Sequence, residues 1–320
     1  MKTKVFVLST ISLLSFFNIA FASDSEICER EIENKNYTTS FPYCEKACDL
    51  KDGKGCRKLG WLYDLGHGVK QDYQQAETYY EKACDLKDGT GCSNLGSLYI
   101  TGQGVKQDYQ QAKTYFAKAC SLSDGDGCTM LGSLYYYGDG VERDYQQAKT
   151  YYEKACSLIN GGSGCARLGK LYVEGRGVKQ DYKQAKNYYE KACSLNDGYG
   201  CAGLGSLYDE GAGVKQDYQQ AKTYFEKAYS LNGGWSCNAL GQLHGDGLGV
   251  KQDYTKAKTY FEKGCSLNNA PSCTNLGLLY YHGRGVRQNK KVSKEYFGKS
   301  CDLGFQDGCD DYRKLIRQGY

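Results

Sequence analysis

Proline and histidine are scarce in this sequence, and each shortage excludes something. Only two prolines occur among 320 residues, and no low-complexity stretch is present, so no flexible linker between separate domains is predicted. The histidines are His67, His244 and His282, and no His-x-His-x-Asp cluster joins them, which disfavours a histidine-based metal centre. Structural or surface roles are expected for all three, and neither a metal nor a cofactor is predicted.

An excess of either charge is also missing. The first 22 residues contain Lys2 and Lys4 and no acidic residue, so the rest of the chain has 39 basic side chains (41 minus 2) against 37 acidic ones. Surfaces that bind nucleic acid or anionic membranes normally carry a clear basic excess. Neither partner is therefore expected.

The N-terminus has the pattern of a secretory signal peptide. Lys2 and Lys4 precede an apolar run that ends at Phe21, and Ala20-Phe21-Ala22 forms a small-residue cleavage site. Polar residues interrupt the run, and no cysteine follows closely enough for bacterial lipid attachment. We therefore expect residues 1–22 to be removed, no membrane span to remain, and the mature chain to be secreted or periplasmic.

Cysteine, by contrast, is abundant: the chain has 17, of which 14 form seven local pairs of nearly constant spacing. Structural zinc sites use short Cys-x-x-Cys knuckles, and none of these pairs has that spacing. Disulfides fit the pairs better and agree with an oxidising compartment outside the cytoplasm. The predicted disulfides are Cys48–Cys56, Cys84–Cys92, Cys120–Cys128, Cys156–Cys165, Cys193–Cys201, Cys265–Cys273 and Cys301–Cys309.

Three cysteines lie outside this pattern. Tyr229 stands where the local partner of Cys237 is expected, so Cys237 is predicted to be either a buried, inert thiol, which we favour, or available for an intermolecular bond. The other two are Cys28 and Cys44. An alignment of the first unit on the second places them on facing helices, so we hypothesise an eighth disulfide, Cys28–Cys44, that closes the first hairpin.

The cysteines mark a unit that repeats about every 36 residues, which is typical of a solenoid. Each unit contains two amphipathic patterns of helical period. In the second, Ala112, Phe116 and Ala119 form one apolar stripe and Asp108 is placed to cap the helix. In the first, glycine recurs at Gly96 and its equivalents; since a helical glycine costs about 1 kcal/mol, a close approach by the facing helix is the expected reason.

The predicted fold is therefore all-α: a right-handed α/α superhelix of helix pairs linked by disulfides. Four regions are expected along it. They are a signal peptide at 1–22, a degenerate N-terminal capping repeat at 23–51, seven repeats of about 36 residues at 52–304, and a C-terminal capping helix at 305–320.

Blocks such as LGSLYITGQGVKQDYQQAKTYFAKAC and LGKLYVEGRGVKQDYKQAKNYYEKAC resemble the Sel-like repeat family, which is related to the tetratricopeptide repeats. With their paired cysteines they resemble the Helicobacter cysteine-rich proteins more narrowly. That resemblance implies a secreted protein that binds penicillin and slowly hydrolyses beta-lactams. The mature chain has no Ser-x-x-Lys, Ser-Asp-Asn and Lys-Thr-Gly set, so no catalytic residue is assigned.

The alternative hypothesis is a binding scaffold without enzymatic activity. In helical solenoids the variable positions of each first helix line a concave groove. Here those positions include Lys58, Asn94, Arg167 and Asn275. Amides of this kind can hold an extended peptide backbone, and the cations can bind its terminal carboxylate, as in tetratricopeptide arrays. The predicted partner is a peptide, a cell-wall fragment or a protein, and a beta-lactam could enter the same groove.

Overall fold

A computed structural model of the protein describes residues 22–231 and 234–320. The predicted signal peptide therefore lies outside the described residues, except for Ala22. Within the described part the chain forms 17 helices and no strand. The all-α prediction is confirmed.

The helices alternate between two types, which we call first and second helices. The first helices are α1 (Asp24–Glu33), α3 (Gly53–Leu65), α5 (Gly89–Thr101), α7 (Gly125–Tyr137), α9 (Gly162–Glu174), α11 (Gly198–Glu210), α13 (Ser236–Asp246), α15 (Ala270–His282) and α17 (Gln306–Arg317). The second helices are α2 (Tyr37–Asp49), α4 (Tyr73–Asp85), α6 (Tyr109–Ser121), α8 (Tyr145–Ser157), α10 (Tyr182–Ser194), α12 (Tyr218–Ser230), α14 (Tyr254–Ser266) and α16 (Lys290–Asp302).

Side-chain caps and glycines fix the ends of these helices. The Asp108 carboxylate accepts hydrogen bonds from the backbone N–H groups of Gln110 and Gln111, as predicted, and the equivalent aspartate caps α4, α8, α10, α12 and α14. The first helix α5 ends at Gly102, whose φ of 72° is left-handed, and a glycine ends α3, α7, α9, α11, α13 and α15 in the same way. These signals repeat, so nearly every unit is a pair of helices of 13 residues each, with the same geometry.

The recurring glycine inside each first helix lies against an aromatic ring of the second helix. A Cβ atom built on Gly96 would stand 2.7 Å from Cε1 of Phe116, and Gly60 meets Tyr80 in the same way. Real Cβ atoms do not approach so closely, so only glycine allows the buried ring to seat here. The predicted reason for the helical glycines is confirmed.

All eight predicted cysteine pairs are disulfide-bonded in the structure, with Cα–Cα distances from 4.4 to 5.0 Å. Seven of the bonds join a second helix to the first helix of the next unit. The eighth, Cys28–Cys44, joins α1 to α2 within the first hairpin. Cys237 is free and buried.

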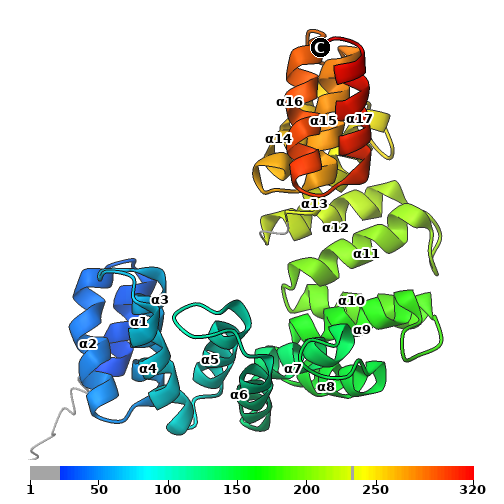
Figure 1. The fold of residues 1–320 in the computed structure, drawn as a ribbon. Helices are drawn as coiled ribbons and strands as arrows, with labels where there is room; N and C mark the ends of the chain where they lie inside the picture. Colours follow the sequence, from blue (N-terminus) through cyan, green and yellow to red (C-terminus); the bar gives the residue numbers. More distant parts are fainter. Residues whose placement is uncertain (1–21, 232–233) are drawn as a thin grey trace, which may run out of the picture.

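The helix pairs stack into a curved array rather than a globule (Figure 1). The chain runs in one direction through α8 and then turns, so that α9 to α17 continue along another. The buried residues follow the array as a row of clusters, such as Ala76, Tyr80, Leu95 and Leu98 between α4 and α5. The predicted right-handed α/α superhelix describes this fold.

Candidate functional site

The first helices form the inner surface of the array. All but the α11 and α13 pair pack on their counterparts in neighbouring units, for example α7 on α9 and α9 on α11, whereas successive second helices contact each other slightly or not at all. In a curved stack the crowded side is the concave one. The side chains exposed along the first helices therefore line the concave face.

The four predicted groove residues occupy one register of this face. Lys58, Asn94, Arg167 and Asn275 lie on α3, α5, α9 and α15, and all are half-buried. They are spread along the array, and no interaction recorded for the described residues joins one of them to another. The structure therefore places them on one surface but not in one compact site.

Each of these residues already contacts the protein. The Lys58 ammonium lies 3.2 Å from the Glu29 carboxylate of α1, and the Arg167 guanidinium lies over the ring of Tyr199, 5.3 Å from its centre. Asn94 lies near the hydroxyl of the buried Tyr80, which donates to Asp64 over 3.1 Å. Both predicted carboxylate-binding cations are thus engaged by the chain itself.

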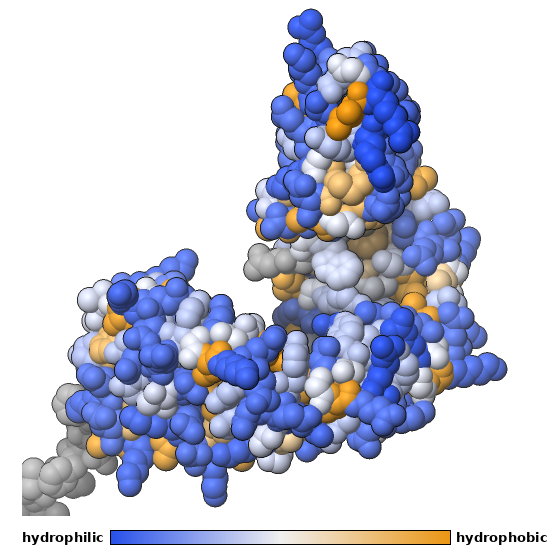
Figure 2. Space-filling view, viewed as in Figure 1, coloured by the Kyte–Doolittle hydropathy of each residue, from blue (hydrophilic) through white to orange (hydrophobic). Residues whose placement is uncertain are grey.

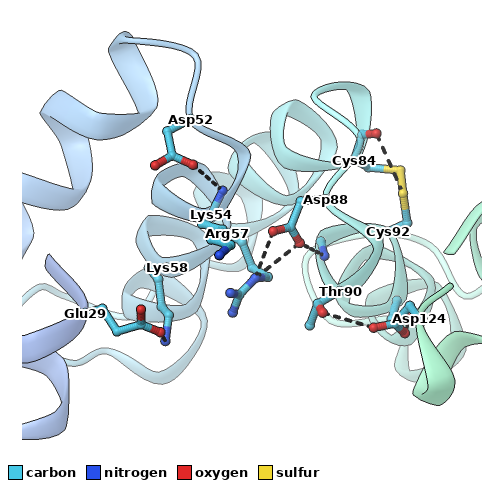
Figure 3. Close-up of polar contacts among 12 residues, drawn as sticks. Glu29, Asp52, Lys54, Arg57, Lys58, Cys84, Asp88, Thr90, Cys92 and Asp124 are labelled. Atoms are coloured by element: carbon cyan, nitrogen blue, oxygen red, sulfur yellow. Dashed lines mark hydrogen bonds and ion pairs between the residues drawn. A yellow bond between two sulfur atoms is a disulfide. The ribbon is translucent and has the colours of Figure 1, made fainter. Parts of the chain in front are cut away.

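At the N-terminal end, polar side chains mainly link one unit to the next (Figure 3). Arg57 of α3 lies 3.2 Å from the carboxylate of Asp88, which also caps α5. Thr90 of α5 donates to Asp124, the cap of α7, over 3.0 Å. These carboxylates therefore satisfy helix termini and neighbouring units and are not available to a ligand.

An apolar cavity of about 200 Å³ opens between α9, α11 and α13. The rings of Tyr189 and Phe225 line it, and the Tyr199 and Trp235 rings, 5.2 Å apart between their centres, stand beside each other at its wall. Trp235 remains 53% exposed. Figure 2 shows the surface hollowed at the level of α12 and α13, with apolar atoms at the back of the recess.

Small residues create this cavity. Gly203 and Ala239 hold the register that carries Asn94 on α5 and Arg167 on α9. A Cβ atom on Gly203 would lie 2.6 Å from Cζ of Tyr189, so the tyrosine ring fills the space beneath the glycine. The cavity is smaller than typical small-molecule sites of roughly 300–1,000 Å³ and suits one side chain.

A second, more open hollow of about 490 Å³ lies on the other side of α13, between α13, α15 and α17. Three asparagine and glutamine side chains cross its floor as a hydrogen-bonded relay. Asn275 Nδ2 donates to Asn238 Oδ1 over 2.9 Å, and Asn238 Nδ2 donates to Gln242 Oε1 over 3.2 Å. The relay ends in an acceptor, Asn275 Oδ1, and a donor, Gln242 Nε2, neither of which is hydrogen-bonded within the described residues.

Carboxylates border this hollow. Asp307, Asp310 and Asp311 line it on α17, and Arg313 forms an ion pair with Asp310. No hydrogen bond or ion pair engages Asp307 in the described part of the chain. Burial raises the pKa of Asp311; the nearby Lys314 opposes this shift, and Asp307 and Asp310 add a smaller effect in the raising direction.

The histidines take structural positions. His67 stacks on Tyr37 with ring centres 4.3 Å apart, and the buried His244 stacks on Tyr260 at 5.7 Å. His282 ends α15 beside Tyr281. In the residues that the structure describes, no three metal-binding side chains come together.

Sequence reasoning missed the cavity and the relay. The groove positions were identified by their large polar residues, whereas the cavity forms where the same register carries Gly203 and Ala239. Two signals in the sequence pointed to it. One is the replacement of large side chains by glycine and alanine at this register, and the other is the pair Tyr199 and Trp235, which stand where other units have Asp126 or Ser163. Its position next to the junction without a disulfide could also have been read from Tyr229.

Comparisons with known proteins agree with the repeat frame. The Sel1 repeat model matches residues 53–88, 90–124, 125–160, 162–197, 198–233, 236–269 and 270–305. A Sel1 repeat protein from Oxalobacter formigenes has 28% identity and a TM-score of 0.68, over 76% of this chain and 99% of that one. The protective antigen c5321 of uropathogenic Escherichia coli has 27% identity and a TM-score of 0.61, over 92% of this chain and 64% of that one.

A curated relative also matches over a short segment. HcpC of Helicobacter pylori, a candidate beta-lactamase by its name, is 43% identical over 46 residues, which is 14% of this chain and 16% of the relative. The chain therefore spans about a sixth of the length of that relative. The match supports the cysteine-rich repeat frame.

Proposed function

Because this chain belongs to the Sel1 repeat family, we propose that it is a non-enzymatic scaffold whose concave face binds an extended segment of a partner protein. Helical repeat arrays present long concave surfaces of this kind to proteins and peptides. Lys58, Asn94, Arg167 and Asn275 extend the proposed surface along the array. The two hollows beside α13 form its centre.

The open-ended amide relay is the observation that carries this proposal. An extended peptide unit presents one N–H and one C=O, and it needs one acceptor and one donor. Asn275 Oδ1 and Gln242 Nε2 offer that pair, because the relay uses only the other amide atom of each residue, Asn275 Nδ2 and Gln242 Oε1. The apolar cavity on the other side of α13 can receive a side chain of the same segment.

The disulfides favour binding because they make the array of repeats rigid. Seven bonds fix the junctions between units, so the concave surface loses little conformational entropy when a partner binds. Such bonds persist in oxidising compartments, and we propose that the protein works in the periplasm or outside the cell. None of the described helices is long and apolar enough to cross a membrane.

Selection of short random peptides displayed on phage tests the proposal. Peptides enriched on the oxidised protein should bind about tenfold more weakly to a Gln242→Ala, Asn275→Ala double variant, because backbone hydrogen bonds are lost. Circular dichroism and the thermal midpoint report whether the variant remains folded. Peptides that bind a folded double variant unchanged would contradict the proposed relay site.

Beta-lactam hydrolysis is the alternative function, and it rests only on the name of HcpC and the family resemblance. Turnover of a chromogenic cephalosporin by the oxidised protein measures it directly, with Asn94→Ala and Arg167→Ala variants in parallel. We expect no turnover above buffer. Repeated turnovers that disappear in the variants would assign hydrolysis to the groove and replace the scaffold proposal.

A further inference from the structure

We infer that the bound segment is basic and carries one bulky apolar side chain, which enters the cavity between α9, α11 and α13 while its lysine or arginine residues lie over the hollow between α13 and α17. This inference rests on the proposed function and narrows the chemistry of the partner. It concerns a protein segment and not a small molecule.

The lining of the cavity selects the apolar side chain. Tyr189, Leu207 and Phe225 present carbon atoms to the space, and Tyr199 and Trp235 stand at the wall as an aromatic pair. An aromatic or branched aliphatic side chain would bury its surface against these rings, and buried aromatic anchors dominate the energetics of many interfaces. The volume of about 200 Å³ admits one such side chain.

The charges around both hollows select a basic segment. Glu210 borders the cavity, and Asp307, Asp310 and Asp311 border the open hollow. Arg167 lies over Tyr199 at the cavity wall and Arg313 pairs with Asp310, so among the described residues the unpaired negative charge is at Asp307 and Asp311 of the open hollow. Asp307 lacks an ion-pair partner in that part of the chain, and Asp311 is half-buried. Arriving cations would pair with these carboxylates and speed association.

The opposite polarity, a terminal carboxylate bound by cations, has less support in the structure. Lys58 already pairs with Glu29, and Arg167 already stacks on Tyr199. A carboxylate would have to displace these contacts, whereas the exposed Asp307 of α17 has no ion-pair partner among the described residues. These contacts favour a basic segment over the terminal carboxylate expected from the sequence.

The relay fixes how the two parts connect. α13 contributes Ala239 to the cavity, beside Trp235 at its N-cap, and Asn238 and Gln242 to the open hollow. A backbone that crosses α13 would hydrogen-bond Gln242 Nε2 and Asn275 Oδ1 between its apolar residue and its basic residues. The cavity, the relay and the carboxylates are thus successive contacts along one extended chain.

The phage selection also tests this inference through the sequences that it enriches. Enriched peptides should combine lysine or arginine with one aromatic or branched aliphatic residue, and their binding should weaken as salt is raised. Enrichment of acidic peptides, or of peptides without a shared apolar residue, would overturn the inference.

Two variants with matched controls locate the contacts. Ser206→Leu fills the cavity with a residue that α15 carries naturally at this register, Leu278, so the helix should tolerate it. We expect binding of the selected peptides to weaken about tenfold, while Ser97→Leu, the same change on α5, leaves it unchanged. Gly203 is unsuitable because any side chain there would strike Tyr189.

Asp307→Asn removes the unpaired carboxylate and should weaken binding about threefold with a shallower salt dependence. Glu153→Gln on the second helix α8 is the control and should have no effect. If the peptides depend on Gln242 and Asn275 but not on Ser206 or Asp307, the scaffold proposal stands and this inference is wrong. A selection that enriches no peptide contradicts both.

Discussion

Seven of the eight junctions between a second helix and the next first helix carry a disulfide, whereas the junction between α12 and α13 carries Tyr229 and the free thiol of Cys237. α12 and the short helix α13 also share the least contact of any consecutive pair of helices, and α11 and α13 contact each other little or not at all. The apolar cavity opens at this place. The irregular junction and the candidate site are therefore the same feature.

A pair of very small residues explains much of the difference. At the junction of α4 and α5, Ala83 faces Gly91, where a Cβ atom would lie only 2.6 Å from the alanine Cβ. Between α14 and α15 the sizes are exchanged, since Gly264 faces Ser272. Between α12 and α13, Ala228 and Ser236 stand at these two positions, so both residues carry a Cβ. The helices cannot approach as closely, and a disulfide is absent.

Reduction of the disulfides should have the largest effect on stability. It removes the covalent bond that distinguishes seven junctions from the junction between α12 and α13. The chain-entropy model assigns roughly 2.5 kcal/mol to each short closed loop, and the seven contributions are not independent. We expect a strong reductant to lower the thermal midpoint by tens of degrees on the scale of such losses. A midpoint that does not move in the presence of reductant would show that the disulfides contribute little to stability.

The opposite change adds the missing disulfide. Tyr229→Cys places a second thiol at the position that bonds Cys237 by the repeat pattern, and the closed loop should stabilise the protein by about 2 kcal/mol. Thiol titration should find no free thiol, and the thermal midpoint should rise. Peptide binding should weaken, since the bond draws α13 toward α12.

The control for this variant combines Tyr229→Cys with Cys237→Ala. It loses the same tyrosine but cannot form the bond, so it should be no more stable than the wild-type protein. If the control gains the same stability, the effect comes from the loss of the half-exposed Tyr229 side chain and not from the disulfide.

His244 provides a third difference in the same unit. Six other units stack two tyrosines between their first and second helices, such as Tyr208 on Tyr224 with ring centres 5.7 Å apart, whereas here His244 stacks on Tyr260. Nδ1 of His244 is buried and has no hydrogen-bond partner within the described residues. Burial lowers its pKa below the ordinary 6.5, and Lys256 and Lys222 add to the shift.

This shift makes stability depend on pH. The unfolded chain binds a proton to this histidine near pH 6.5, and the folded protein resists binding until the pH is lower. Its stabilising contribution is therefore complete above pH 6.5 and is lost as the pH falls toward the folded-state pKa. His244→Tyr should remove this part of the dependence and add about 1 kcal/mol through tyrosine stacking. Urea unfolding between pH 7 and pH 5 measures both effects, and His282→Tyr, at an exposed position, should change neither.

The fold could be predicted from the sequence because its signals recur in every unit. Asp108 and its equivalents cap the helices, Gly96 and its equivalents seat the aromatic rings, and the cysteine pairs mark the junctions. Repetition lets one correct interpretation apply to the whole array. The Cys28–Cys44 pair followed from the same logic, since it replaces the contact between glycine and ring in the first hairpin.

The candidate site could not be predicted in the same way, because it depends on departures from the repeat. Gly203 and Ala239 carry no functional group that would indicate a binding site. The relay from Asn275 to Gln242 depends on the spacing of α13 and α15, which the sequence does not give. The contacts of Lys58 and Arg167 could not be foreseen either, since their partners Glu29 and Tyr199 lie on other units. Single residues indicate chemistry, but only the folded array shows which of them are already engaged.

The smallest expected effect comes from Ala228→Gly, which copies the small residue of α14 onto α12 and leaves the thiol unchanged. Loss of the alanine costs about 1 kcal/mol of helix propensity, and closer packing of α12 on α13 should offset much of it, so the free energy of unfolding should change little. Peptide binding should nevertheless weaken, because α13 moves and the cavity narrows. Ala192→Gly is the same change at the junction of α10 and α11, which carries a disulfide. This variant should lose stability by the full helix-propensity cost of about 1 kcal/mol and leave peptide binding unchanged. If both variants lower stability equally and neither alters binding, the spacing of α12 and α13 does not create the cavity.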